Sequence, residues 1–133
     1  MIELEMIMKI LVAALFGGII GYEREIKTKP AGLRTHILVC LGSTIFTVLS
    51  LEAFPGADTA RVAAYIIAGI GFIGAGTVIQ TKEKITGLTT AASLWITASI
   101  GMAIGTGFYV LGAIATVISY LTLRLSKLEK KKR

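Results

Sequence analysis

No charged side chain occurs between Ile85 and Leu123, and this run constrains the fold more than any other feature. One membrane-spanning helix needs about 20 consecutive apolar residues. The run is therefore long enough for two helices that turn at Gly105-Thr106-Gly107. The whole chain is 54% hydrophobic, above the roughly 45–50% of soluble domains, and its mean hydropathy is +0.77. These features predict a membrane protein.

Three further spans are predicted before this run, near residues 6–22, 33–51 and 62–79. Lys9 falls inside the first of them, but it lies close enough to the end for its side chain to reach the interface. The expected fold class is an all-α membrane protein. Its five transmembrane helices would occupy residues 1–123, and a basic cytoplasmic tail would follow at residues 124–133.

Lys and Arg are distributed unevenly between the predicted connections. All of them except Lys9 and Arg61 fall in residues 23–36, in the connection near residues 82–84, or at the C-terminus. Because cytoplasmic loops carry an excess of basic residues, we expect the N-terminus outside and the C-terminus in the cytoplasm. The basic run 130–133 would then lie at anionic lipid headgroups. Contact with the lipid bilayer accounts for the net charge of +6, and no nucleic-acid partner is expected.

The chain is also similar to itself at an offset of about 55 residues. The matching positions include Gly21 and Gly76, Lys27 and Lys82, Gly32 and Gly87, and Thr35 and Thr90. Each copy would be a helical hairpin, which predicts a parallel repeat of two hairpins with a fifth helix added. Chance agreement between glycine-rich helices is the alternative interpretation.

Two predicted helices carry a face of small and hydroxyl-bearing residues at helical spacing. One face consists of His36, Cys40, Ser43 and Thr47, and the other of Thr86, Thr90, Ser93, Thr97, Gly101 and Gly105. We interpret both as packing surfaces, because small residues let helices approach closely in a bilayer. We interpret the GxxxG pairs Gly17/Gly21 and Gly101/Gly105 in the same way, as sites where helices pack closely. The packed helices could belong to one chain or to two copies of it. A path for a solute is the alternative.

Residues 23–36, the charged segment, contain most of the usable chemistry. Glu23 with Lys27, and Glu25 with Lys29, have the i, i+4 spacing of helical ion pairs. They predict a solvated, salt-bridged helix that continues to Pro30, with Pro30 opening the next helix. In that next helix, Arg34 is expected to pair with one of these glutamates or to bind phosphate. His36 ionises near neutral pH in water and could carry a proton, although such residues more often hydrogen-bond between helices.

No enzymatic activity is expected. No paired carboxylates share a buried face, and the only histidine has no nucleophile and orienting acid nearby. The glycines of residues 69–74 match a dinucleotide fingerprint, but they lie inside a predicted span without a preceding strand. The carboxylates all fall near span ends, so a metal site is unknown, with Glu23 and Glu25 as weak candidates. We expect no cofactor, with Mg²⁺ entering only as a ligand or a signal.

Three blocks of sequence resemble the N-terminal membrane domain of the MgtC/SapB family. They are residues 17–36, which contain Gly-Gly-Ile-Ile-Gly-Tyr-Glu-Arg-Glu and Ala-Gly-Leu-Arg-Thr-His, residues 58–76, and residues 87–95, which read Gly-Leu-Thr-Thr-Ala-Ala-Ser-Leu-Trp. The motif positions that the resemblance marks as functional are Glu23, Arg24, Glu25, Arg34, Thr35, His36, Asp58, Arg61, Thr89 and Thr90. Tyr65 and Thr86 depart from the family pattern, where glutamine and a basic residue are usual.

The resemblance implies a multi-pass protein of the bacterial cell inner membrane that is linked to magnesium homeostasis or stress. We expect it to form a homo-oligomer and to modulate other membrane machinery by contact with a membrane-protein partner. The charged segment would be its cytoplasmic contact surface. A transporter of magnesium or another cation is the alternative. The cytoplasmic C-terminal domain of many relatives is not expected, because the sequence stops at Arg133.

Overall fold

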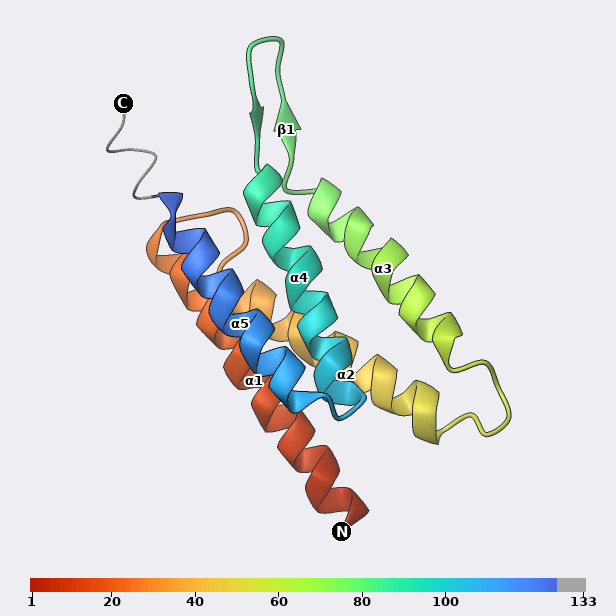
Figure 1. Cartoon of the computed structure of the whole chain (residues 1–133). Coiled ribbons are helices and arrows are strands. Elements are labelled where there is room, and N and C mark those ends of the chain that lie inside the picture. Colours follow the sequence, from red (N-terminus) through yellow and green to blue (C-terminus); the bar gives the residue numbers. More distant parts are fainter. Residues whose placement is uncertain (127–133) are drawn as a thin grey trace.

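A computed structural model describes residues 1–126 of the chain, which form helices and one short hairpin (Figure 1). The helices are α1 (Ile2–Ile26), α2 (Leu33–Glu52), α3 (Ala60–Ala75), α4 (Leu88–Gly105) and α5 (Tyr109–Arg124). Strands β1 (Ile79–Gln80) and β2 (Ile85–Thr86) pair antiparallel between α3 and α4. The basic run 130–133 lies outside the described residues.

The five predicted helices are present in the part of the chain that the structure describes. Of these, α1, α2 and α4 are long and apolar enough to cross a membrane, whereas α3 and α5 have 16 residues each. The predicted end of the third helix at Ile79 is wrong, because α3 stops before Gly76 and the chain enters the hairpin. The predicted turn after α4 is confirmed, and Gly107 adopts the positive φ (87°) that favours glycine there.

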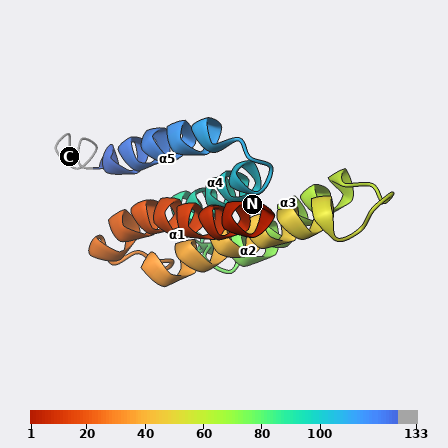
Figure 2. The ribbon, with the colours of Figure 1, turned by 90° about the horizontal axis from the view of Figure 1, so that it is seen from below.

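The helices run in alternating directions along the bundle (Figure 1). The α1–α2 connection, the β1–β2 hairpin and the end of α5 lie at one end, which we call the charged end. The N-terminus, the α2–α3 connection and the α4–α5 turn lie at the other. Helix α4 contacts each of the other four helices, and Figure 2 shows α5 and α2 on different sides of the bundle. Residues near the start of α2 and the start of α4 therefore meet at the charged end.

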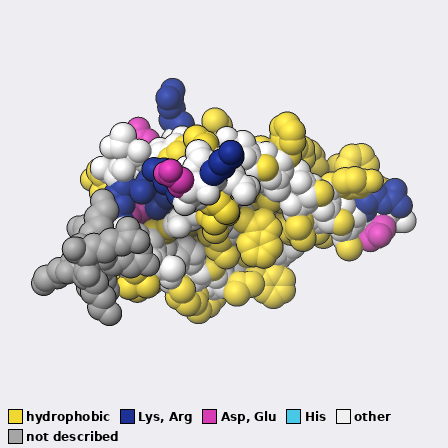
Figure 3. Space-filling view, turned by 90° about the horizontal axis from the view of Figure 1, so that it is seen from above, with side chains coloured by type: hydrophobic (Ala, Val, Ile, Leu, Met, Phe, Trp, Pro, Cys, Tyr) yellow, Lys and Arg dark blue, Asp and Glu magenta, His cyan; other side chains and the backbone are white. Residues whose placement is uncertain are grey.

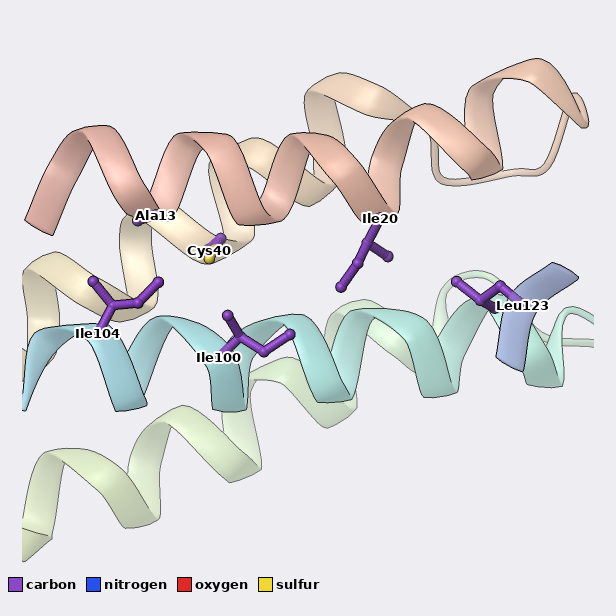
Figure 4. Close-up of a cluster of buried hydrophobic side chains, with 6 residues drawn as sticks. All are labelled: Ala13, Ile20, Cys40, Ile100, Ile104 and Leu123. Atoms are coloured by element: carbon purple, nitrogen blue, oxygen red, sulfur yellow. The ribbon is translucent and has the colours of Figure 1, made fainter. Parts of the chain in front are cut away.

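A cluster of buried apolar side chains lies between α1, α2, α4 and α5 (Figure 4). Its members are Ala13, Ile20, Cys40, Ile100, Ile104 and Leu123. Most of the larger apolar side chains instead face outward, among them Leu11, Phe46, Phe72, Trp95 and Leu121. An apolar exterior around a small interior is the distribution that a bilayer requires, because lipid tails are as apolar as these side chains.

Glycines bring the backbones of α1 and α4 against α2. A Cβ atom added at Gly17 would lie 2.7 Å from the carbonyl oxygen of His36, and one at Gly101 would lie 2.6 Å from that of Cys40. The second glycine of each GxxxG pair is equally close to α2. Both pairs therefore serve contact within the chain, which was one of the two predicted meanings.

The polar faces of α2 and α4 are confirmed as packing surfaces. They lie against each other, and hydroxyl groups of α2 donate to carbonyl groups of α4. Ser43 Oγ donates to Ala98 O at 2.6 Å, and Thr44 Oγ1 donates to Gly101 O at 2.9 Å. The prediction that Thr86 belongs to this face is wrong, because it lies in β2. The hydroxyls that bridge the two helices are thus already used by the protein itself.

The glycine contacts predict opposite outcomes for two Gly→Ala substitutions. Gly101→Ala should destabilise the protein by about 1–3 kcal/mol, because the new methyl group must push α2 and α4 apart. Gly71→Ala, also within a helix but with no atom within 4 Å of the new Cβ, should be neutral or slightly stabilising. Thermal unfolding in detergent, followed by circular dichroism, measures both. Equal melting temperatures for the two variants would contradict the packing assignment.

Candidate functional site

The charged segment begins inside α1, where two of its ionic side chains are buried. Glu23 is 1% exposed and Arg24 is 2% exposed. Arg24 Nη1 lies 3.6 Å from Glu23 Oε2, and Lys27 Nζ forms a second ion pair with Glu23 Oε1. The Glu23–Lys27 pair is therefore confirmed. The prediction of a solvated face is wrong for Glu23 and Arg24, because this turn of α1 contacts α4 at Thr90 and the end of α5 at Leu123.

Lys27 joins α1 to the end of α5. Its Nζ donates to the carbonyl oxygen of Leu123 at 2.8 Å and to Ser126 Oγ at 2.7 Å. The last carbonyl groups of a helix lack partners within the helix and carry a partial negative charge. A cation at this position therefore stabilises the end of α5 while it also neutralises Glu23.

Arg24 joins α1 to α4. Its Nη2 donates to Thr90 Oγ1 at 2.9 Å, across 66 residues of sequence. The 3.6 Å separation from Glu23 is too long for a hydrogen bond, and Arg24 Nε has no acceptor among residues 1–126. The guanidinium is thus held by charge and by one hydrogen bond, not by a fully satisfied set of acceptors.

His36 joins α2 to α4 and is completely buried. Its Nδ1 lies 2.8 Å from Gly32 O, and its Nε2 lies 2.9 Å from Ser93 Oγ. A carbonyl oxygen only accepts, so Nδ1 carries a hydrogen. Ser93 Oγ also lies 2.7 Å from Thr90 O, which is a second possible acceptor for its hydroxyl hydrogen.

The single hydroxyl hydrogen of Ser93 allows two arrangements around His36. If Ser93 donates to Thr90 O, then Nε2 must donate to Ser93 and the imidazole is charged. If Ser93 donates to Nε2, the imidazole is neutral, and Thr90 O loses only a side-chain partner. The positions of the non-hydrogen atoms are therefore compatible with both the neutral and the charged imidazole of His36. Thr90 belongs to both hydrogen-bonding groups, since its hydroxyl binds Arg24.

The second half of the charged segment forms a tight connection. Helix α1 ends at Ile26 and α2 begins at Leu33. The predicted extension of both helices to Pro30 is therefore wrong, whereas the predicted second helix near residues 33–51 is confirmed. Thr28 has a positive φ of 54°, which does not continue a helix. Glu25 Oε2 accepts the backbone N–H of Leu33 at 3.0 Å, and among the described residues Glu25 takes part in no ion pair. Its carboxylate therefore caps α2 instead of pairing with Lys29.

The remaining predicted residues lie elsewhere. Arg34 is exposed and has no ion-pair partner within residues 1–126, so the predicted pairing with a glutamate is not formed there. Thr35 lines a groove between α2 and α3. Asp58 and Arg61 are exposed at the opposite end, where Asp58 Oδ1 accepts the first amide of α3 at 3.0 Å. Thr89 is exposed beside Thr90.

The structure therefore brings together four of the predicted residues and two others. The cluster, which we call the junction, consists of Glu23, Arg24, Lys27, His36, Thr90 and Ser93. Lys27 and Ser93 were absent from the predicted site, although the sequence placed Lys27 opposite Glu23 and Ser93 on the polar face of α4. The junction connects α1, α2, α4 and α5 at the charged end.

The junction does not provide a set of ligands suited to a metal ion. Residues 1–126 contain no group of three or more His, Cys, Asp and Glu side chains placed to hold one. Glu23 already faces two cations, and Glu25 accepts a backbone amide. Magnesium needs several oxygen ligands in octahedral geometry, and within residues 1–126 neither weak candidate belongs to a group of three or more such side chains.

The sequence of the chain matches a family model, that of the MgtC family, over residues 10–131. The chain belongs to the MgtC family. The blocks that resembled this family contain all six residues of the junction, four in residues 17–36 and two in residues 87–95. The recognition made from the sequence is thus confirmed.

Relatives in the MgtC family are similar over most of the chain. YhiD of Escherichia coli (strain K12), whose name proposes a magnesium transporter, is 43% identical, with 91% of this chain and 60% of YhiD covered. Protein SapB of Bacillus subtilis (strain 168) is 42% identical, over 81% of this chain and 50% of SapB. Protein MgtC of Brucella abortus (strain 2308) is 44% identical, over 79% of this chain and 44% of that protein. The chain thus spans about half the length of these curated relatives. No solved structure matches it.

The buried charges predict a large loss of stability when Glu23 alone is neutralised. Glu23→Gln should destabilise the protein by about 3–5 kcal/mol, because Arg24 loses its counter-charge inside the bundle. Glu83→Gln removes the same charge from the exposed hairpin and should change stability by less than about 0.5 kcal/mol. Thermal unfolding in detergent compares the two variants.

A double variant separates the ion pair from other effects. Glu23→Gln combined with Arg24→Gln should lose less stability than the sum of the single variants, because the two charges compensate each other. Additive losses, or a Glu23→Gln variant as stable as Glu83→Gln, would contradict a buried ion pair.

Proposed function

We propose that the chain is a multi-pass protein of the bacterial inner membrane with five spans, its N-terminus outside and its C-terminus in the cytoplasm. The alternating helices place the charged segment, the lysines of the hairpin and the end of α5 at one end of the bundle (Figure 1). This supports the assignment of that end to the cytoplasm, where basic residues are enriched. Helices α3 and α5 are about 24 Å long, so flanking residues must extend them across a hydrocarbon core of about 30 Å.

Cysteine labelling tests this topology. In a Cys40→Ala background, Thr81→Cys in the hairpin should react with a membrane-impermeant maleimide only after the cells are opened. Ala57→Cys, in the α2–α3 connection, should react in intact cells. Both positions are exposed, so accessibility does not limit either reaction. The reverse pattern would place the charged end outside the cytoplasm and overturn the proposed orientation.

Within this topology, the protein acts by contact with another membrane component in magnesium limitation or acid stress. The observation that carries the proposal is the closed interface between α2 and α4. Glycines bring the two backbones into contact, and hydroxyls that could line a solute path donate to carbonyl groups instead. Among residues 1–126, Glu23 at the charged end of α1 is the only buried carboxylate, and it is paired with cations, whereas paths for cations usually have a carboxylate at membrane depth.

The contact surface is narrower than the whole charged segment. Glu23 and Arg24 are buried, so they hold the helices in place and do not face a partner. Lys29 and Arg34 are exposed and remain available for contact at the charged end. Neither an enzymatic step nor a resident cofactor enters this proposal, and Mg²⁺ acts as a signal or a ligand.

A transporter of magnesium or another cation is the alternative, and two observations favour it. One relative is named as a proposed magnesium transporter. The junction also contains an ionisable imidazole connected through Ser93 and Thr90 to buried charges, which is an arrangement that transporters use for protons.

Magnesium uptake by liposomes that contain only the purified protein separates the two functions. We expect no uptake above empty liposomes for the parent chain or for Arg34→Ala, because the α2–α4 interface is closed. In native membranes, Arg34→Ala should reduce cross-linking of the protein to its partner. Saturable uptake by the parent that is lost in Arg34→Ala would overturn the contact proposal in favour of transport. Circular dichroism of the reconstituted protein verifies that it is folded.

A further inference from the structure

Helices α2 and α3 diverge and leave a groove of about 670 Å³ between them. Helix α3 packs mainly against α4, and within α3 only Ile70 and Gly74 are buried. The groove walls are almost entirely apolar and include Leu38, Val39 and Phe46 from α2, and Tyr65, Ile66 and Ile73 from α3. Ser43 also contributes, but its hydroxyl already donates to α4. The groove thus suits an apolar occupant that needs few hydrogen bonds.

Two glycines in the groove walls differ from those of the α2–α4 interface. Gly42 of α2 and Gly69 of α3 both line the groove, and a Cβ atom at either would meet no atom within 4 Å. Contacts within the chain therefore do not require a glycine at these positions. Because neither glycine has a side chain, the groove is wider at these two positions than it would be with a larger residue.

The end of the groove that lies at the charged end carries positive charge. Arg34 precedes the groove residue Thr35 and lies one helical turn before Leu38, which places it at this rim. Its side chain is exposed. Beyond α3 at the same end of the bundle, the hairpin carries exposed Lys82 and Lys84, with exposed Glu83 between them. Figure 3 views this end and shows Lys and Arg side chains, with Asp and Glu side chains among them, beside exposed apolar ones.

We propose that this groove binds an anionic phospholipid, with an acyl chain between α2 and α3 and the headgroup phosphate at Arg34. An apolar groove between helices with basic residues at one end complements such a lipid in both shape and charge, and a guanidinium matches the geometry of a phosphate. The proposal requires the bilayer location but no protein partner. It therefore goes beyond the contact function and is tested separately from it.

A tryptophan placed in the groove reports the occupant. Trp95 is the only tryptophan of the chain and does not line the groove, so the reporter variant carries Trp95→Phe and Tyr65→Trp. It is reconstituted in phosphatidylcholine vesicles with increasing fractions of a lipid whose acyl chains are brominated, because bromine quenches tryptophan fluorescence on contact. Brominated phosphatidylglycerol should reach half-maximal quenching at a mole fraction about fivefold lower than brominated phosphatidylcholine.

Two further variants test the groove and its charged rim. Gly42→Leu should fill the groove and abolish the preference for phosphatidylglycerol. Gly71→Leu, which adds the same side chain to an open position of α3 outside the lining, should leave it unchanged. Arg34→Gln should remove the preference but retain quenching by both lipids. Circular dichroism verifies the fold, and because both leucines enter open space, both variants should remain folded.

Several outcomes would overturn the proposal. Equal quenching by the two lipids in the reporter variant would show ordinary bilayer contact. A preference that survives Gly42→Leu would place the lipid elsewhere. If Gly42→Leu instead converts an oligomer to a monomer, as measured by light scattering in detergent, a second copy of the chain occupies the groove. None of these measurements includes a protein partner. Because Arg34 enters both proposals, Gly42→Leu, which leaves Arg34 in place, is the variant that distinguishes a failure of the lipid site from a failure of the contact function.

Discussion

The contacts of glycine backbones with α2 are the constraint on which the rest of the structure depends. Apolar side chains gain little by exchanging lipid for protein, so helices in a bilayer associate through close packing and hydrogen bonds. Glycines of α1 and α4 approach α2 so closely that a methyl group would not fit at Gly17 or Gly101. At this spacing the short hydroxyl side chains of α2 reach carbonyl groups of α4. The same spacing lets His36 reach Ser93.

The close packing brings the residues of the junction together. Their contacts determine how the helices are aligned more than they add to the free energy of unfolding. Burying an ion costs several kcal/mol, and the attraction of its partner repays this only when the hydrogen bonds are complete. At the junction they are not complete, because Arg24 Nε has no acceptor within the described residues. The ionic contacts nevertheless determine which turn of α1 faces which turn of α4 and which end of α5 they meet. Arg24, Lys27 and His36 each connect a different pair of helices.

Much of this arrangement could be predicted from the sequence, for physical reasons that also explain what could not. Charge-free runs locate helices because a bilayer excludes charge, and the periodic hydroxyls of α2 and α4 reveal a shared interface because helical geometry is regular. The burial of Glu23 and Arg24 could not be predicted, since the i, i+4 spacing of Glu23 and Lys27 fits an exposed helix equally well. The Arg24–Thr90 contact is equally invisible, because it joins residues that only the fold brings together. The hairpin at residues 79–86 was too short to distinguish from a loop.

These features divide the molecule into a fixed part and a loosely attached one, which bears on how it could respond to its surroundings. Helices α1, α2 and α4 are in backbone contact and bonded through the junction, so a movement between them would have to break several buried interactions together. Helix α3 has few buried residues and leaves a groove beside α2. Regions with few buried contacts open most easily. A change in lipid, or contact with a partner, would therefore move α3 and the hairpin first, while the junction keeps the remaining helices in register. This division favours a role in sensing or contact over alternating access, which requires the central helices themselves to move.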